Sequence, residues 1–158
     1  MARKEKISCV SAYDAALNYL TPKARTVREV ELKLDEGNYS EGEIMQTVER
    51  LQDAGLLDDE AYAKSFVESR LSTKPVSRFR LEEQLKGHHV PPDIIESALD
   101  AVGSEIELNN AVQVAKKYLR QFENMDDEEE KLRRVYNRLR TRGYSHDIIM
   151  QAVSEARE

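Results

Sequence analysis

Apolar residues recur along the chain in a pattern that repeats three times. Each copy is anchored by one leucine, at Leu34, Leu85 or Leu139. Further apolar residues lie four positions before each anchor and ten and fourteen positions after it: Val30, Ile44 and Val48; Leu81, Ile95 and Leu99; Val135, Ile149 and Val153. The anchors are 51 and 54 residues apart. Self-similarity at this period is typical of stacked helical repeats, which usually offer an extended binding surface and do not enclose a catalytic pocket.

Helix start and stop signals divide each copy into three helices. Residues whose side chains cap helix N-termini are expected at Ser11, Thr26, Ser40, Asp58, Ser77 and Ser145. Glycines at 55, 103 and 143 are expected to end helices. The pattern therefore predicts an all-α fold of about nine helices, built as three tandem three-helix repeats stacked into an elongated, curved array. The predicted repeats are 1–57, which includes a short N-terminal extension, 58–103 and 104–158.

Composition agrees with helices packed on helices. Apolar residues make up 40% of the chain and charged residues 34%, tryptophan is absent, and 6 glycines with 4 prolines provide few tight turns. The single cysteine, Cys9, excludes an internal disulfide and a cysteine-based zinc site, and is expected to be an inert thiol. The start Met1–Lys6 is charged with no apolar run behind it, which predicts no signal peptide, no membrane contact and a cytoplasmic location.

Charge is unevenly distributed along the chain, whose net charge is -6. The windows 23–33, 70–86 and 131–142 carry +2, +3 and +6, and each includes the second helix of a repeat. Such basic stripes predict local contacts with phosphates or with a charged partner, with a solvated helix face as the alternative interpretation. The candidate contact residues are Arg25, Arg28, Arg70, Lys74, Arg78, Arg80, Arg133, Arg134, Arg138 and Arg140. Few aromatic residues accompany them, so stacking of single-stranded bases is only weakly indicated.

The sequence contains no arrangement typical of catalysis. Its serines fall at helix caps, and no glycine-rich phosphate loop or nucleophile elbow is present. The acids Asp58–Asp59–Glu60 are interpreted as a helix cap because no further ligand stands at metal-binding spacing. His88 and His89 are interpreted as residues of a solvated turn. No enzymatic activity, cofactor or metal is therefore expected.

Two stretches resemble the bacterial RecX family. Residues 55–63, Gly-Leu-Leu-Asp-Asp-Glu-Ala-Tyr-Ala, resemble the family signature, through Gly55, Leu57, Asp58, Asp59, Tyr62 and Ala63. Residues 138–145 followed by Ile148–Ile149 resemble its third-repeat motif, and Leu32–Lys33–Leu34 and Leu85–Lys86–Gly87 resemble its second-helix ends. The resemblance covers about 15–153. The chain departs from the family at Pro75–Val76–Ser77, where a glycine is frequent, and at Gly87–His88–His89.

The resemblance implies a regulator of the RecA recombinase. Members of the family bind RecA, mainly as its filament on single-stranded DNA, and inhibit its recombinase, ATPase and co-protease activities. The resemblance also implies that some members bind DNA directly and that no cofactor is needed. The chain is expected to act as a monomer, with Asp58 and Asp59 in capping and unit stacking. Two alternatives stay open: a direct DNA-binding regulator and a helical scaffold for another protein.

Overall fold

The computed structural model describes residues 10–158, and in that range all regular structure is helical. Its nine helices are α1 (Ala12–Leu20), α2 (Val27–Glu36), α3 (Glu41–Asp53), α4 (Asp59–Thr73), α5 (Arg78–Gly87), α6 (Pro92–Asp100), α7 (Ser104–Gln121), α8 (Glu128–Thr141) and α9 (His146–Ala156). The predicted all-α class is confirmed. The expectations for Cys9 and for Met1–Lys6 fall outside the described residues.

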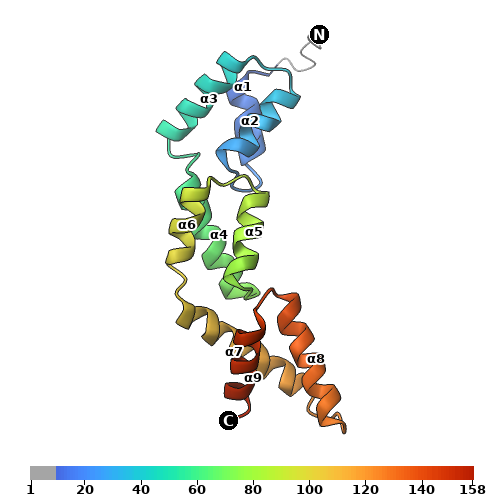
Figure 1. Cartoon of the computed structure of the whole chain (residues 1–158). Helices are drawn as coiled ribbons and strands as arrows, with labels where there is room; N and C mark the ends of the chain where they lie inside the picture. The colour runs from blue at the N-terminus through green and yellow to red at the C-terminus, as the bar shows by residue number, and fades with distance from the viewer. Residues whose placement is uncertain (1–9) are drawn as a thin grey trace.

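The helices form three groups that follow one another along an elongated, gently curved molecule (Figure 1). Each group surrounds its own cluster of buried apolar residues. The clusters draw on residues 12–57 in α1–α3, 63–102 in α4–α6, and 111–152 in α7–α9. We refer to the three groups as units 1, 2 and 3, and we propose unit boundaries at 57/58 and 103/104.

The anchor leucines lie at the centre of each unit. Leu34, Leu85 and Leu139 are at most 1% exposed. The carbonyl of each accepts a hydrogen bond from the backbone N–H five residues later, at 3.1–3.4 Å. The intervening residue, four after the anchor, has left-handed backbone: Asn38 (φ 62), His89 (φ 62) and Gly143 (φ 88). This Schellman-type ending closes the second helix and starts the third in all three units.

The predicted helix caps are confirmed. Thr26 and Ser40 form complete capping boxes with Glu29 and Glu43. Side-chain caps are also present at Ser11, Asp58, Ser77, Asp127 and Ser145. These bonds satisfy N–H groups that a helix start leaves without a partner inside the helix.

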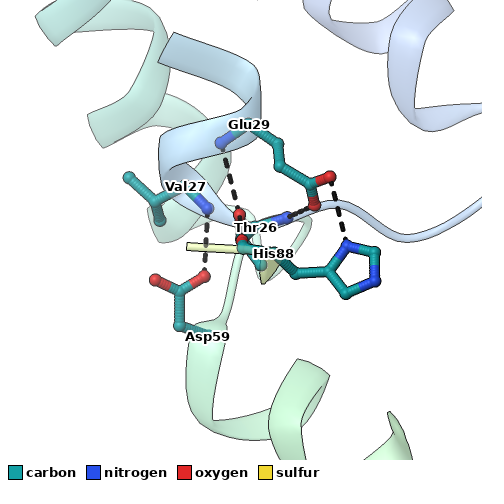
Figure 2. Close-up of polar contacts among 5 residues, drawn as sticks. All are labelled: Thr26, Val27, Glu29, Asp59 and His88. Atoms are coloured by element: carbon teal, nitrogen blue, oxygen red, sulfur yellow. Dashed lines mark hydrogen bonds and ion pairs between the residues drawn. The ribbon is translucent and has the colours of Figure 1, made fainter. Parts of the chain in front are cut away.

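The second helices are arranged head to tail along one side of the array, with α2, α5 and α8 in succession (Figure 1). At the junction of units 1 and 2, the start of α2 meets the end of α5. The Thr26 Oγ1 hydroxyl, fully buried, donates to the carbonyl of His88 at 2.7 Å. The Val27 N–H donates to Asp59 Oδ1 at 3.0 Å (Figure 2).

The junction of units 2 and 3 repeats this arrangement with different residues. The start of α5 meets the end of α8, where the Ser77 N–H donates to the carbonyl of Arg142 at 3.0 Å. The Arg78 N–H donates to Glu107 Oε2 at 2.6 Å. In both junctions the positive end of one helix dipole faces the negative end of the next, which favours stacking in this order.

The interpretation of His88 as a solvated turn residue is wrong. Its side chain is only 34% exposed because unit 1 packs over the turn that ends α5. The centre of its ring lies 5.9 Å from that of the Tyr62 ring and 5.5 Å from that of the Phe66 ring. Its Nδ1 lies 3.5 Å from Glu29 Oε2 (Figure 2). Its neighbour His89 is exposed, as predicted.

Candidate functional site

The ten basic candidate residues do not form one surface. Four of them line a single hollow of about 270 Å³ between units 2 and 3: Arg70, Lys74, Arg80 and Arg138. Arg70 and Lys74 come from the end of α4, Arg80 from α5 and Arg138 from α8. The hollow, which we call the 2–3 hollow, is completed by Val76, Gln84, Tyr118, Thr141 and Arg142. None of the described residues that line it is acidic.

Arg142 forms the fixed floor of the 2–3 hollow. It is 7% exposed, and its guanidinium donates to the Pro75 carbonyl at 3.0 Å and to the Tyr118 hydroxyl at 3.2 Å. Together, these bonds join the α4–α5 link to α7. The hydrogen bond from Arg142 is the main cause of a lowered pKa of the Tyr118 phenol. The Arg138 guanidinium lies 5.6 Å from the centre of the same ring, within cation–π range.

A second hollow of about 510 Å³ lies beside the first, at the junction of units 1 and 2. We call it the 1–2 hollow. Arg70 lines both hollows, and the other lining residues are Lys23, Ala24, Tyr62, Ser65, Phe66, Ser69, Thr73 and His88. It too lacks acidic lining residues in the described chain. The two hollows share Arg70, and their lining residues come from all three units; we refer to the pair as the cationic groove.

Other basic candidates lie among carboxylates. Arg28 lines a hollow with Glu31, Asp35, Glu41 and Glu49 on α2 and α3. Arg78 lines a hollow with Glu82, Glu96 and Asp100 on α5 and α6. Both arginines share their hollows with acidic side chains, and neither lines the two basic hollows described above.

The remaining candidates are Arg133, Arg134 and Arg140 on α8, and Arg25 just before α2 at the junction of units 1 and 2. Arg133 and Arg134 both pair with Glu130 one turn earlier on α8, and these hydrogen bonds lower the pKa of the Glu130 carboxyl. The Arg25 guanidinium lies 4.1 Å from the centre of the Tyr19 ring. Arg140 is exposed on α8.

The signature stretch forms the connection between units 1 and 2. Gly55 has φ +74, and Leu57 is 2% exposed in the core of unit 1. Asp58 accepts from the Ala61 N–H at 3.0 Å, and Asp59 accepts from Val27 across the junction. Burial is the main cause of a raised pKa of the Asp59 carboxyl. Ala63 is fully buried in unit 2, and Tyr62 packs half-buried against its core.

Sequence reasoning missed the aromatic part of the groove. Tyr62 and Phe66 belong to α4 and Tyr118 to α7, whereas most of the candidate arginines lie on second helices. The Arg70 guanidinium lies 5.2 Å from the centre of the Phe66 ring. The one available signal was an aromatic residue on the inner face of every first helix, at Tyr19, Phe66 and Tyr118.

Residues 10–158 offer neither a metal site nor a membrane span. They contain no group of three or more histidine, cysteine, aspartate or glutamate side chains able to hold a metal ion. None of their helices is long and apolar enough to cross a membrane.

Comparison with known proteins gives the same family from sequence and from structure. The three-helix domain models of RecX match residues 12–51 as the first domain, 58–99 as the second and 105–153 as the third. A regulatory protein RecX of Clostridium botulinum is 30% identical over 157 residues, which is 99% of this chain and 72% of that protein. One from Prosthecochloris aestuarii is 30% identical over 144 residues, 91% of this chain and 92% of that protein.

Solved RecX structures share the fold. The crystal structure of RecX from Lactobacillus salivarius superposes with a TM-score of 0.79 at 29% sequence identity, over 92% of this chain and 94% of that one. A second structure, of a regulatory protein RecX, superposes with a TM-score of 0.75 at 26% identity, over 90% of this chain and 71% of that one. The chain therefore belongs to the RecX family of regulatory proteins.

Proposed function

We propose that this protein binds the RecA recombinase, as its filament on single-stranded DNA, and inhibits the recombinase, ATPase and co-protease activities of RecA. It would thereby modulate DNA repair, recombination and the SOS response. Family membership supports the regulatory role. The single structural observation that favours a filament as the target is the cationic groove, whose lining residues come from all three units.

The shape of the array suits such a target. A filament offers a long helical groove lined by protein and phosphate, and an elongated stack of units has contacts spaced along its length. Of the ten candidate residues, we assign the primary contact role to Arg70, Lys74 and Arg138, because no carboxylate lines their hollow; Arg80 lines it too but pairs with Glu83 at 3.1 Å. We assign Asp58 and Asp59 to capping and unit stacking on the strength of their hydrogen bonds to Ala61 and Val27.

The decisive experiment measures the ATPase rate of RecA on single-stranded DNA with and without this protein, together with co-sedimentation on the filament. We expect inhibition and co-sedimentation at ratios at or below one protein per RecA. The absence of both at equal stoichiometry would overturn the proposal.

Charge reversal separates the two groups of arginines. The triple variant Arg70→Glu, Lys74→Glu, Arg138→Glu should lose inhibition. The triple variant Arg28→Glu, Arg78→Glu, Arg140→Glu changes the net charge by the same amount but outside the groove. It should keep most of the inhibition. Equal loss in both variants would contradict the assignment of contacts while leaving the proposed function in place.

The direct DNA-binding alternative predicts a different experimental result. It requires strongly salt-dependent binding to duplex DNA in the absence of RecA, with no effect on RecA beyond competition for DNA. A helical scaffold for another protein would leave the RecA ATPase unchanged.

A further inference from the structure

A further large hollow, of about 490 Å³, lies on a different face of α4 from the cationic groove. Its walls are α4 and α6, and the first turn of α7 contributes Ile106 at one end. We call it the α4–α6 hollow. It shares no lining residue with either basic hollow, so the two surfaces can be altered separately.

The two walls of the α4–α6 hollow run in the same direction. α4 begins at the junction with unit 1, where Asp59 accepts from the Val27 N–H. α6 follows the turn whose His88 carbonyl accepts from Thr26 at the same junction. Both helices then run toward unit 3 (Figure 1). The lining residues span 60–71 on α4, so at 1.5 Å per residue the hollow is about 16 Å long, or about three helical turns.

The two ends of the hollow differ in chemistry. Glu60 and Asp93 lie in the first turns of α4 and α6, so carboxylates gather at the end near unit 1. Leu71, Val102 and Ile106 lie at the end near unit 3. Ile106 is 46% exposed, so this apolar end is open to water. An apolar patch with a charged rim is typical of a surface that binds another protein.

The carboxylates of the hollow are not used inside the described part of the protein. The side chains of Glu60, Glu68 and Asp93 form neither an ion pair nor a hydrogen bond with any described residue, whereas Glu130 on α8 pairs with two arginines. Three carboxylates against the single ammonium group of Lys64 leave the hollow with a net charge of -2. Negative potential over an apolar floor is complementary to a ligand that is both cationic and apolar.

The shape of the hollow fits a helix. Two helices packed side by side leave a furrow in which a third helix can lie at an interaxial distance of about 8–10 Å. Ser97, Ala98 and Ala101 keep the α6 wall low, because their side chains are small. A helix in this place would convert the three helices of unit 2 into a four-helix bundle. Apolar grooves of this kind bind amphipathic helices through side chains three or four positions apart.

A second copy of this chain fits the hollow less well than a separate partner does. Its large exposed apolar residue with basic neighbours is Phe79, which is 63% exposed between Arg78 and Arg80. Arg80 already pairs with Glu83 at 3.1 Å, and Arg78 lies in a hollow with three carboxylates. The positive charge around Phe79 is therefore largely balanced within its own chain.

We propose that the α4–α6 hollow docks a cationic amphipathic helix of a partner protein. Aliphatic or aromatic side chains of that helix pack on Leu71, Ile94 and Ile106. Lysine or arginine side chains on the same face, about three turns away, pair with Glu60 and Asp93. This site needs neither RecA nor DNA, and so goes beyond the proposed function. It makes the protein an adaptor, with the cationic groove on one face of α4 and the partner helix on another.

The test is isothermal titration calorimetry of the full-length protein with a designed peptide of about 18 residues, which as a helix is about 27 Å long and exceeds the hollow. One face of the peptide carries leucines at one end and lysines at the other, and the remaining positions are alanine and glutamine. The same sequence in reverse order covers a helix bound in the opposite direction. Two control peptides replace the lysines by glutamates or the leucines by glutamines.

Charge reversal tests the carboxylate end of the hollow. The variant Glu60→Lys, Asp93→Lys should bind the leucine–lysine peptide at least about 10-fold more weakly at low salt, because attractive pairs become repulsive. The matched control is Glu129→Lys, Asp147→Lys, which reverses two exposed acids in the first turns of α8 and α9. The control should change the affinity by less than about 3-fold, because its charges lie far from the bound peptide.

A single substitution tests the apolar end. Ile106→Ser should weaken peptide binding by about 5-fold or more, because it removes apolar surface that the peptide covers. The matched control is Met150→Ser, at a residue of α9 that is 53% exposed outside the hollow, and it should change the affinity by less than about 2-fold. The effect of Ile106→Ser should persist at high salt, where the effect of charge reversal declines. Circular dichroism confirms that each variant is folded.

Four results would overturn the docking site. These are no binding of the peptide in either direction, equal weakening in hollow and control variants, equal affinity for the peptide without leucines, and self-association of the protein alone that Ile106→Ser abolishes. The last would identify a second copy as the occupant. RecA inhibition is measured separately, so absent peptide binding with retained inhibition would reject this site and leave the proposed function standing.

Discussion

Four residues after the anchor leucine, the backbone of each unit takes a left-handed conformation, and the residue there differs each time. Asn38 and His89 occupy the position in units 1 and 2, and Gly143 in unit 3. Units 1 and 2 tolerate a side chain there, but unit 3 does not. A Cβ on Gly143 would lie 2.5 Å from Ser77 Oγ and 3.1 Å from Arg80 Cβ. Gly143 is therefore required both by conformation and by the close approach of unit 2.

We expect Gly143→Ala to destabilise the protein by about 2–4 kcal/mol, because it adds left-handed strain to a steric clash at the unit 2–3 junction. Urea denaturation gives the change in the free energy of unfolding. His89→Gly is the contrasting variant, because it relieves a left-handed side chain at an exposed site and should stabilise by up to about 1 kcal/mol. An unchanged midpoint for Gly143→Ala would refute the close packing.

The buried phenol of Tyr144 makes the stability of the protein depend on pH in the alkaline range. Its hydroxyl is buried without a hydrogen-bond partner in the described structure, and burial raises the pKa of its phenol well above the ordinary value. Because the folded pKa exceeds the unfolded one, the stability from the neutral phenol is fully present below about pH 10 and decreases as pH rises further.

Tyr144→Phe removes a buried hydroxyl that has no partner, and we expect it to be neutral or to stabilise by about 1 kcal/mol at neutral pH. The gain should grow above about pH 10, since the variant no longer loses stability through this phenol. Urea midpoints at several pH values measure both effects. Destabilisation of Tyr144→Phe at neutral pH would reveal a partner for the hydroxyl.

Single residues with strong local preferences were predictable from the sequence. Ser11, Thr26 and Ser145 cap their helices as expected, because a cap depends on residues within four positions. His88 was misjudged because its surroundings come from Glu29, 59 residues away. Phe79 shows the same limit in the opposite direction: this large apolar side chain of α5, between Arg78 and Arg80, is 63% exposed.

At the scale of helices, the same kind of hydrogen bond joins neighbouring units at both junctions. A carboxylate near the start of the next unit's first helix accepts from the first N–H of the second helix, as Asp59 does for Val27 and Glu107 for Arg78. The acceptor also lies at the positive end of a helix dipole. The sequence hinted at the first of these through the signature stretch, but nothing in it singled out Glu107.

We expect Glu107→Ala to destabilise the protein by about 1–2 kcal/mol, since the Arg78 N–H loses a charged acceptor in a half-buried place. Glu107→Gln keeps an acceptor oxygen and should lower the free energy of unfolding by a smaller amount. Glu105→Ala, in the same first turn but exposed, is the matched control and should change stability little. Thermal denaturation followed by circular dichroism compares the three. Equal effects of Glu107→Ala and Glu105→Ala on stability would contradict a specific role of Glu107 at the junction of units 2 and 3.

The groove itself could not have been predicted from helix patterns. The sequence places the arginines on second helices and the aromatic rings on first helices, so the composition alone argued against base stacking. They meet only because the junctions fix how units stack, through contacts such as Arg142 with Pro75, 67 residues apart. The repeat predicted that units stack, but the direction of stacking depends on these specific polar contacts.

Over the whole molecule, three separate apolar clusters are joined by polar junctions. A unit of about 45 residues is marginally stable alone, so the junctions should contribute both stability and a defined overall shape. A compact chain of this length would have a radius of gyration of about 15 Å. The elongated array in Figure 1 should exceed that value clearly in small-angle X-ray scattering.

The double variant Arg142→Ala, Glu107→Ala tests whether the junction holds the shape. It removes the guanidinium bonds to Pro75 and Tyr118 and the acceptor for Arg78, while leaving the apolar clusters untouched. We expect a broader distribution of interatomic distances in scattering and a lower melting temperature, with the helical circular dichroism signal at low temperature preserved. The Tyr118 phenol, which Arg142 holds at a lowered pKa, should titrate at higher pH in this variant. An unchanged distance distribution would mean that packing between units alone sets the curvature, and the groove would then keep its form without Arg142.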